Sequence, residues 1–317
     1  MQKLTTTVLA ALLLWCSTVF GQSFKNEFGF KSENDAYLFY GQDRYYTNGL
    51  FINFRHALDQ QKLKGSIEKV IYEVEVGQQM YNPISGYAPN LIDHDRPFAG
   101  YLYGGGKLSL FYTKETVLKG GIQLGTVGPR ALGREAQELL HDIVGFYDID
   151  GWQYQIRNEL AVNLSAQYLK LLHRSGKQDL DFSLETNVNA GTTFAGVGAG
   201  ILFRTGKINQ LFNSSYTNAV ISNNSKTKRL VESECYFYAK PQLHVILHDS
   251  TIEGSMFTSE SPVTFEAKPL VFAQQVGFNY SSQRFTFDFG LTFKSKEVKS
   301  IAKAHQYGSI SMFYRFN

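Results

Sequence analysis

Hydrophobic and polar residues alternate one by one along most of this chain. Phe285, Phe287 and Phe289, for example, alternate with Thr286 and Asp288. Successive side chains of a β-strand point to opposite faces, so each such segment has one apolar and one polar face. About twelve segments show this pattern: 25–38, 46–57, 68–80, 98–112, 116–127, 153–173, 177–190, 193–205, 231–248, 268–281, 283–297 and 303–316.

The apolar faces are long and continuous, which favours a membrane barrel over a soluble sandwich, whose strands are shorter on average. An even number of antiparallel strands is the rule for single-chain barrels of the bacterial outer membrane. The last segment carries Phe316 near its end, as is usual for the last strand of a barrel, although Asn317 replaces a terminal aromatic residue. We therefore predict an all-β fold, an antiparallel transmembrane β-barrel of about 12 strands that forms one domain over residues 22–317.

One segment breaks the alternation and predicts a short helix between the fifth and sixth strands. Residues 129–145 begin with a proline, continue with apolar residues at helical spacing and end at a glycine. Gln137 and His141 are four residues apart and so share one face of this helix. The simplest interpretation is a helix that caps the barrel mouth, with His141 merely hydrogen-bonded. Residues 209–228 and 249–261, rich in polar and turn-forming residues, are predicted to be surface loops.

The first residues predict export from the cytosol. Lys3 precedes an apolar stretch at 8–15 that is too short to span a bilayer, and Val19-Phe20-Gly21 after it is a passable cleavage site. We predict that residues 1–21 are a signal peptide. A lipoprotein site at Cys16 is disfavoured because Trp15 is bulky, and removal of Cys16 leaves Cys235 without an intramolecular disulfide partner.

Composition agrees with an outer-membrane protein. Aromatic residues make up 15% of the chain, with 19 Tyr and 25 Phe, which suits aromatic girdles at two membrane interfaces. The 31 basic and 28 acidic residues nearly balance, so no electrostatic argument favours nucleic acid, and we expect no nucleic-acid partner. Export and the barrel pattern together place the protein in the bacterial outer membrane.

Clusters of polar residues occur where predicted strands begin or break, at 33–35, 43–49 and 93–100. Their carboxylate and amide oxygens are hard ligands that suit Ca²⁺ better than a transition metal. No Cys/His spacing typical of zinc is present. Asn, Asp and Gly also favour turns for local reasons, so a single cluster would carry no information about function.

Taken in order, these clusters and the helix resemble the lipid A 3′-O-deacylase family of outer-membrane barrels. The matching motifs are Glu33-Asn34-Asp35, Tyr46-Thr47-Asn48-Gly49-Leu50, Asp95-Arg96-Pro97-Phe98-Ala99-Gly100, Gly125-Thr126-Val127-Gly128-Pro129 with Gly133, Gln137 and His141, and Gly151-Trp152-Gln153 with Gln155, Asn158 and Glu159. Their order and spacing agree over about residues 27–160. The resemblance implies a twelve-stranded barrel whose site lies between the barrel wall and the outer leaflet. It implies Ca²⁺-dependent hydrolysis of the ester that holds the 3′ acyloxyacyl group of lipid A, and we expect a monomer that meets lipopolysaccharide in the outer leaflet.

The resemblance assigns catalytic roles to His141, Asn34 and Thr47, with Gln137 beside His141, and metal binding to Asp35 and Asn34. Ester hydrolysis needs a base that deprotonates water and a positive charge for the developing oxyanion. His141 can act as the base near neutral pH. Asp35 is the best Ca²⁺ ligand, with Asn34 as a second oxygen ligand or an oxyanion donor, while Thr47 orients water or substrate.

Two departures from the family pattern leave parts of the site open. Residues 82–94 contain no Lys or Arg for the lipid A phosphates, which leaves Arg130, Arg134 or Lys107 as candidates. An acidic residue is expected shortly after the site histidine, but Tyr147 occupies that position. Asp148 and Asp150 lie nearby, so the acidic partner of His141 is open.

Three other functions compete with the deacylase. A passive porin or a structural barrel would explain the strands but not the helix in register with the other motifs. A Ser–His outer-membrane phospholipase would need a serine two residues after its histidine, and Ile143 stands there.

Overall fold

A computed structural model describes residues 23–38, 43–225 and 227–317, with only the backbone of Val144. The predicted signal peptide, residues 1–21, lies outside the described residues and stays a prediction.

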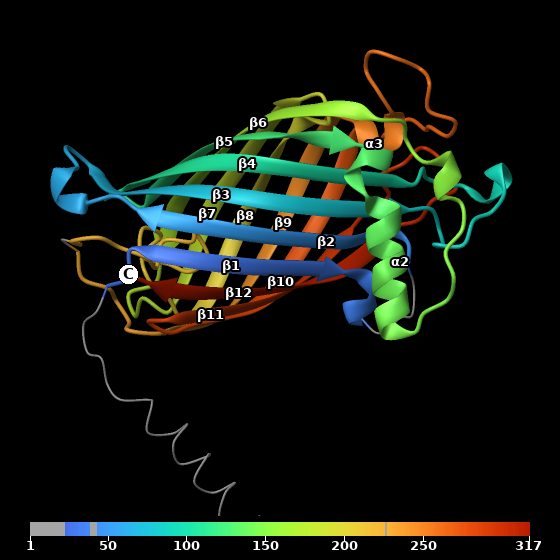
Figure 1. Ribbon diagram of the computed structural model, residues 1–317. Helices are drawn as coiled ribbons and strands as arrows, with labels where there is room; N and C mark the ends of the chain where they lie inside the picture. The colour runs from blue at the N-terminus through green and yellow to red at the C-terminus, as the bar shows by residue number, and fades with distance from the viewer. Residues whose placement is uncertain (1–22, 39–42, 226) are drawn as a thin grey trace, which may run out of the picture.

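The described residues form a closed antiparallel barrel of twelve strands (Figure 1). Each strand pairs with its neighbours in sequence, and β1 pairs with β12 to close the wall. The strands are β1 (Asn26–Asn34), β2 (Tyr45–Ala57), β3 (Ile67–Asn82), β4 (Ala99–Tyr112), β5 (Thr116–Val127), β6 (Glu159–Arg174), β7 (Leu180–Gly191), β8 (Phe194–Lys207), β9 (Glu234–Asp249), β10 (Leu270–Ser281), β11 (Phe285–Lys294) and β12 (His305–Phe316). The predicted fold class and strand number are confirmed.

The two faces of the wall differ as the alternation predicted. Phe28 and Phe30 of β1 point outward and are 48% and 40% exposed. Glu27, on the opposite face of the same strand, is buried in the lumen. Glu27 accepts hydrogen bonds from Arg55 and Arg315, both at 2.8 Å, so these buried charges are paired. A closed barrel satisfies every backbone group of the wall internally, and its apolar outer face matches the hydrocarbon of a bilayer. Among the described residues, no helix is both long and apolar enough to cross a membrane.

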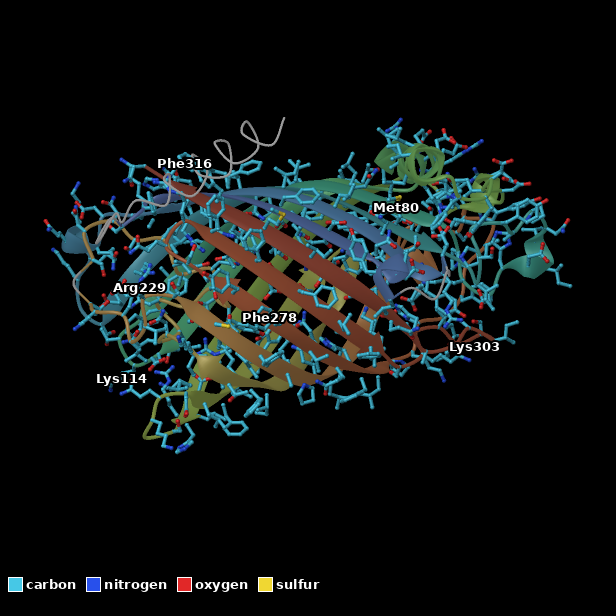
Figure 2. All side chains as sticks on the ribbon, turned by 90° about the horizontal axis from the view of Figure 1, so that it is seen from below. Met80, Lys114, Arg229, Phe278, Lys303 and Phe316 are labelled. Carbon is cyan, nitrogen blue, oxygen red and sulfur yellow. The ribbon has the colours of Figure 1, made fainter. Side chains whose placement is uncertain are left out.

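The two ends of the barrel carry different connections. Figure 2 places Lys114 and Arg229 near one end and Lys303 near the other. The end where β1 begins and β12 ends has short turns, such as residues 113–115 and 282–284, apart from the β8–β9 connection. The opposite end has longer connections, including residues 83–98 and 128–158. Outer-membrane barrels have short periplasmic turns and longer extracellular loops, so the end with the longer connections faces the cell exterior.

The predicted helix between β5 and β6 is confirmed as α2 (Gly133–Val144), preceded by the 3-10 turn η4 (Pro129–Ala131). Gly145, with a φ of 72°, ends α2 and donates its backbone N–H to the carbonyl of His141. The helix lies outside the wall, since Gln78 on the outward face of β3 donates hydrogen bonds to the carbonyls of Ala131 and Leu132 (Figure 1). The expectation that it caps the barrel mouth is therefore wrong.

Five shorter helical segments lie in the connections. They are η1 (Asp35–Leu38), η2 (Gln60–Lys62), η3 (Leu91–Asp93), η5 (Trp152–Tyr154) and α3 (Ser250–Glu253). Two of them shorten predicted strands: η1 ends β1 at Asn34, and η5 delays the start of β6 to Glu159.

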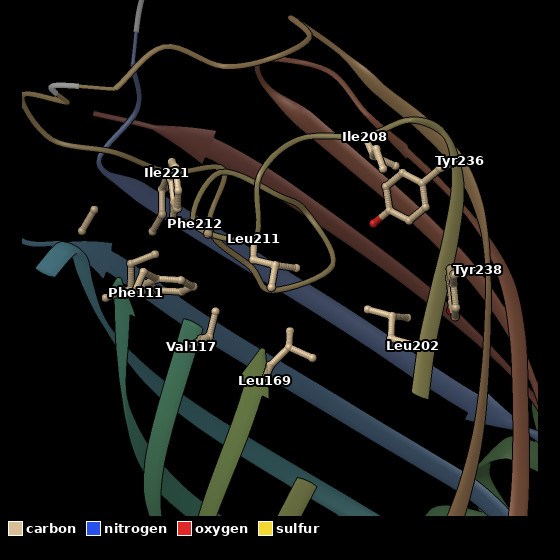
Figure 3. Packing of buried hydrophobic residues seen from close by; sticks show 13 residues of the cluster. Phe111, Val117, Leu169, Leu202, Ile208, Leu211, Phe212, Ile221, Tyr236 and Tyr238 are labelled. Carbon is tan, nitrogen blue, oxygen red and sulfur yellow. The ribbon is translucent and has the colours of Figure 1, made fainter. Parts of the chain in front are cut away.

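The β8–β9 connection contradicts the surface loop that we predicted at 209–228. Residues 208–225, which we call the lumen plug, fold back between the barrel walls (Figure 3). The apolar side chains that the plug buries against the inward-facing wall are Ile208, Leu211, Phe212, Ala219 and Ile221. Its polar groups pair with the wall: Lys69 donates to the Asn213 side chain at 3.2 Å, and Glu234 accepts from the backbone N–H of Ser215 at 2.6 Å. These polar residues of the lumen plug thus contact polar groups of the lumen and not solvent.

Candidate functional site

All five residues predicted for the site line one pocket of about 230 Å³ between α2 and the barrel wall: Asn34, Asp35, Thr47, Gln137 and His141. The rest of its lining is Ser32, Ala36, Tyr37, Asp43, Asn48, Leu50, Leu140 and Phe146. Ser32 lies on the same face of β1 as the outward-pointing Phe30, because every second residue of a strand shares a face. The pocket is therefore on the outer surface of the barrel, next to the membrane and near its extracellular end.

The first wall of the pocket forms where β1 ends. Asn34 is the last residue of β1, and its side-chain oxygen accepts a hydrogen bond from the backbone N–H of Ala36 at 2.6 Å, which turns the chain into η1. Asp35 is only 6% exposed. Its carboxylate accepts from the backbone N–H of Arg44 at 2.8 Å and from the Thr47 hydroxyl at 3.2 Å.

Burial raises the pKa of Asp35 to about 8, and the nearby Asp43 carboxylate acts in the same direction against the two hydrogen bonds. A carboxyl group in such surroundings needs either a proton or a compensating cation. Asp35 is thus a buried acid placed beside a second acid.

Asp43 joins the helix to the strands and is the centre of the site. Its Oδ2 lies 3.2 Å from Nε2 of His141 and accepts hydrogen bonds from Gln137 Nε2 at 2.6 Å and from the Tyr147 hydroxyl at 3.1 Å. Its Oδ1 accepts from the Thr47 hydroxyl. The acidic partner of His141 therefore comes from the segment before β2. The family pattern predicted this acid after the helix, and in the sequence Asp43 is marked only by its place at the start of the 43–49 cluster.

Both ring nitrogens of His141 have partners. Nδ1 lies 2.7 Å from the backbone carbonyl of Tyr147, and because a carbonyl only accepts, Nδ1 carries a proton. Nε2 faces Asp43 on the pocket side. The hydrogen bond with Asp43 raises the pKa of His141 above its usual value and outweighs burial, which lowers it. Tyr147, at the position where an acid was expected, instead orients both the imidazole and Asp43.

The candidates for phosphate recognition are not in the pocket. Lys107 faces the lumen, where it pairs with Glu73 at 2.8 Å, so the expectation that it meets lipid A is wrong. Arg134 pairs with Glu138 on the exposed side of α2, and Arg130 is also exposed.

The oxygen donors around Asp35 include one group that sequence reasoning missed. The side-chain oxygen of Asn48 is buried in the pocket wall without a hydrogen-bond partner. In the part of the chain that the structure describes, no three His, Cys, Asp or Glu side chains converge as a metal site. Any ion here would be held by two carboxylates at most, together with amide oxygens and water, and such mixed oxygen ligands are acceptable to Ca²⁺.

A protein family model matches nearly the whole chain. The family model described as "Outer membrane protein LpxR" matches residues 7–316. LpxR from Salmonella typhimurium has a similar structure, with a TM-score of 0.74 and 20% sequence identity over 92% of this chain and 100% of that chain. At this identity the structural likeness shows a shared fold.

Other solved barrels are less similar. The KdgM porin in complex with disordered oligogalacturonate has a TM-score of 0.40 and 7% identity, covering 92% of this chain and 99% of that chain. The beta domain of the Bordetella autotransporter BrkA has a TM-score of 0.49 and 8% identity, covering 93% and 100%. These two carry no argument about the present chain. No curated protein matches it.

Proposed function

Because this chain belongs to the LpxR family of outer-membrane proteins, the family that its motifs resemble, we propose that it hydrolyses the ester that holds the 3′ acyloxyacyl group of lipid A. The protein is embedded in the bacterial outer membrane. One observation carries the proposal: a buried His141–Asp43 pair and the Asn34–Asp35 pair face the same pocket on the membrane side of the wall.

The place of the pocket suits a lipid substrate. Leu50, Leu140 and Phe146 give it an apolar side, and below it the outward-facing Phe30 and Ile52 extend that surface toward the bilayer. An acyl chain can lie along this apolar wall while its ester group reaches the polar side chains above. A substrate in the outer leaflet thus reaches the pocket without entering the barrel.

His141 is the proposed general base. The Tyr147 carbonyl keeps the proton of the neutral ring on Nδ1, so Nε2, beside Asp43 in the lining of the pocket, is the nitrogen that can accept a proton. Nε2 takes a proton from water as the water oxygen attacks the ester carbonyl carbon. The Asp43 carboxylate, 3.2 Å away, stabilises the imidazolium that forms. The imidazolium then returns the proton to the sugar oxygen as the carbon–oxygen bond breaks, which releases the fatty acid.

Asp35 and Asn34 are the proposed ligands of Ca²⁺, with the Asn48 oxygen as a third. The fit rests on the buried Asp35 carboxyl and the buried Asn48 oxygen without a partner, both of which need a cation or a donor. When bound, Ca²⁺ supplies positive charge that polarises the ester carbonyl. The Thr47 hydroxyl lies within hydrogen-bond distance of both the Asp35 and the Asp43 carboxyl groups, so it links the metal-binding carboxyl to the partner of the base.

The alternative functions explain less of the site. A porin or a structural barrel needs neither a buried His–Asp pair outside the wall nor a plug in the lumen. In the phospholipase, a serine would stand at Ile143, which is 71% exposed and points away from the pocket. We also propose that the protein acts as a monomer, since α2 and the barrel wall of one chain complete the pocket.

Mass spectrometry of lipid A tests the proposal. Purified mature protein in detergent with Ca²⁺ should convert lipid A to a species that lacks one acyloxyacyl group, with fragmentation assigning the loss to the 3′ position. Asp35→Ala, checked for a folded barrel by heat-dependent gel migration, should give no product. Lipid A of unchanged mass after prolonged incubation with folded wild-type protein and Ca²⁺ would rule the proposal out.

A further inference from the structure

The 151–153 motif is not explained by the pocket, because Trp152 does not line it. Trp152 is 2% exposed and packs on Phe98, with ring centroids 5.0 Å apart. Gly133, the first residue of α2, lies directly on the indole: a Cβ there would be 2.7 Å from the Trp152 ring. Trp152 therefore lies under the first turn of α2, and Gln137 follows one turn later.

A chain of hydrogen bonds runs from this indole to the base. Trp152 Nε1 donates to Gln137 Oε1 at 2.7 Å, and Gln137 Nε2 donates to Asp43 Oδ2 at 2.6 Å. That oxygen is the one that lies 3.2 Å from His141 Nε2. Gln137 is 3% exposed, so water does not compete freely for its amide.

The chemistry of the two ends allows only one orientation of the Gln137 amide. An indole N–H can only donate, and an ionised carboxylate can only accept. A reversed amide would place oxygen against the Asp43 carboxylate and two N–H groups against each other at Trp152. Buried polar groups without partners destabilise a structure, so the indole selects the orientation in which Gln137 donates to Asp43.

The surroundings leave Asp43 little freedom once it is held. A side chain at Gly86 would clash with Asp43 Oδ2 and come within 3.1 Å of Gln137 Nε2. The backbone of Gly86 therefore closes the cluster on one side, and its N–H donates to the Tyr147 hydroxyl at 3.3 Å.

We propose that Trp152 is a positioning residue, which fixes the amide of Gln137 through its indole N–H and, through that amide, the Asp43 carboxylate that faces His141. This rests on the proposed function of the pocket. It also gives the Gly151-Trp152 motif and Gly133 a shared role. Together they place the indole N–H of Trp152 beneath α2, next to Gln137.

Steady-state kinetics of Trp152→Phe test the proposal. Phenylalanine keeps an aromatic ring against Phe98 but has no N–H, so kcat should fall by about 10- to 100-fold, as is typical when a group that orients a functional side chain is lost. KM should stay within about twofold of the wild-type value, because Trp152 does not touch the pocket. In Gln137→Met, the further substitution Trp152→Phe should have no additional effect on kcat, since the two residues act through one bond.

Fluorescence tests the bond itself. Trp152 is the only tryptophan beyond Trp15 of the predicted signal peptide, so the emission of the mature protein reports on it alone. Gln137→Met should shift this emission, whereas His141→Ala should not. Phe98→Leu is the control for packing: it should lower the temperature of barrel unfolding but leave kcat of the folded protein unchanged.

A wild-type kcat in folded Trp152→Phe, or losses that multiply in the double variant, would overturn the positioning role. Failure of His141 as the proposed base has a different signature, namely full turnover by folded His141→Ala, and failure of the proposed function is the absence of turnover by folded wild-type protein. If wild-type protein shows no turnover at all, the fluorescence emission of Gln137→Met still tests the hydrogen bond between Trp152 and Gln137. An emission spectrum equal to that of the wild type would exclude this bond.

Discussion

His141 Nε2 and Asp43 Oδ2 lie 3.2 Å apart, although one residue belongs to α2 and the other to the segment just before β2. The contact joins the only long helix of the described chain to the barrel wall at the pocket. It gives the imidazole an acidic partner on the nitrogen that faces the substrate side.

The acid side of the pH–rate profile should depend on Asp43. The base must be neutral to accept a proton, so kcat/KM rises with pH through the pKa of His141, which Asp43 raises above its usual value of 6.5. Asp43→Asn removes the carboxylate and should move this limb to lower pH, while kcat at the plateau falls. Asp142→Asn, an exposed change on the same helix, should move it less. A limb that stays in place or moves to higher pH in Asp43→Asn would contradict the pairing.

Calcium should bind and stabilise the folded barrel. Because a ligand that binds only the native state raises the unfolding temperature, Ca²⁺ should increase the thermal stability of the wild-type protein in detergent, and a chelator should reverse this and abolish turnover. Asp35→Asn and Asn48→Ala should each weaken the thermal shift. Glu266→Gln, at an exposed acid outside the pocket, is the control and should keep it. An equal shift in wild type and Asp35→Asn would place the ion elsewhere.

The lumen plug should make the barrel impermeable. Residues 208–225 pack apolar side chains inside the wall and hydrogen-bond to β3, β8 and β9, as with Lys69, Arg204 and Glu234. Wild-type protein in a planar lipid bilayer should therefore show no steady ion conductance. Replacement of residues 210–222 by a short Gly/Ser linker should increase conductance in barrels that still migrate as folded on gels. Steady channels in the wild-type protein would contradict the sealed lumen.

The sequence predicted the wall far better than the connections. Each strand faces lipid on one side and a polar lumen on the other, so alternation such as that of Phe285 to Asp288 survives in the chain as a local signal. The plug has no such signal. Leu211, Phe212 and Ile221 are scattered among polar residues. They are buried because those polar neighbours pair with charged groups of the lumen, which lie far away in the sequence.

The candidate site divides in the same way. The motifs identified five residues that prove to share one pocket, because each lies at a strand end or on one face of a helix. Asp43 was not recognised as the partner of His141, since only the closed barrel brings the segment before β2 under α2. Tyr147 stands where the family pattern has an acid. Its hydroxyl contacts Asp43 and its backbone carbonyl contacts His141, so it orients both residues.

The central claim is that this pocket performs base-catalysed ester hydrolysis, and the turnover of His141→Ala on lipid A tests it most directly. Folding and turnover should be measured on the same preparation, by heat-dependent gel migration and by mass spectrometry of the lipid. A general base contributes about two to four orders of magnitude to the rate, so folded His141→Ala should show a loss of that size. If folded His141→Ala removes the 3′ acyloxyacyl group at a rate near that of wild type, the base is not His141 and the proposed mechanism is wrong.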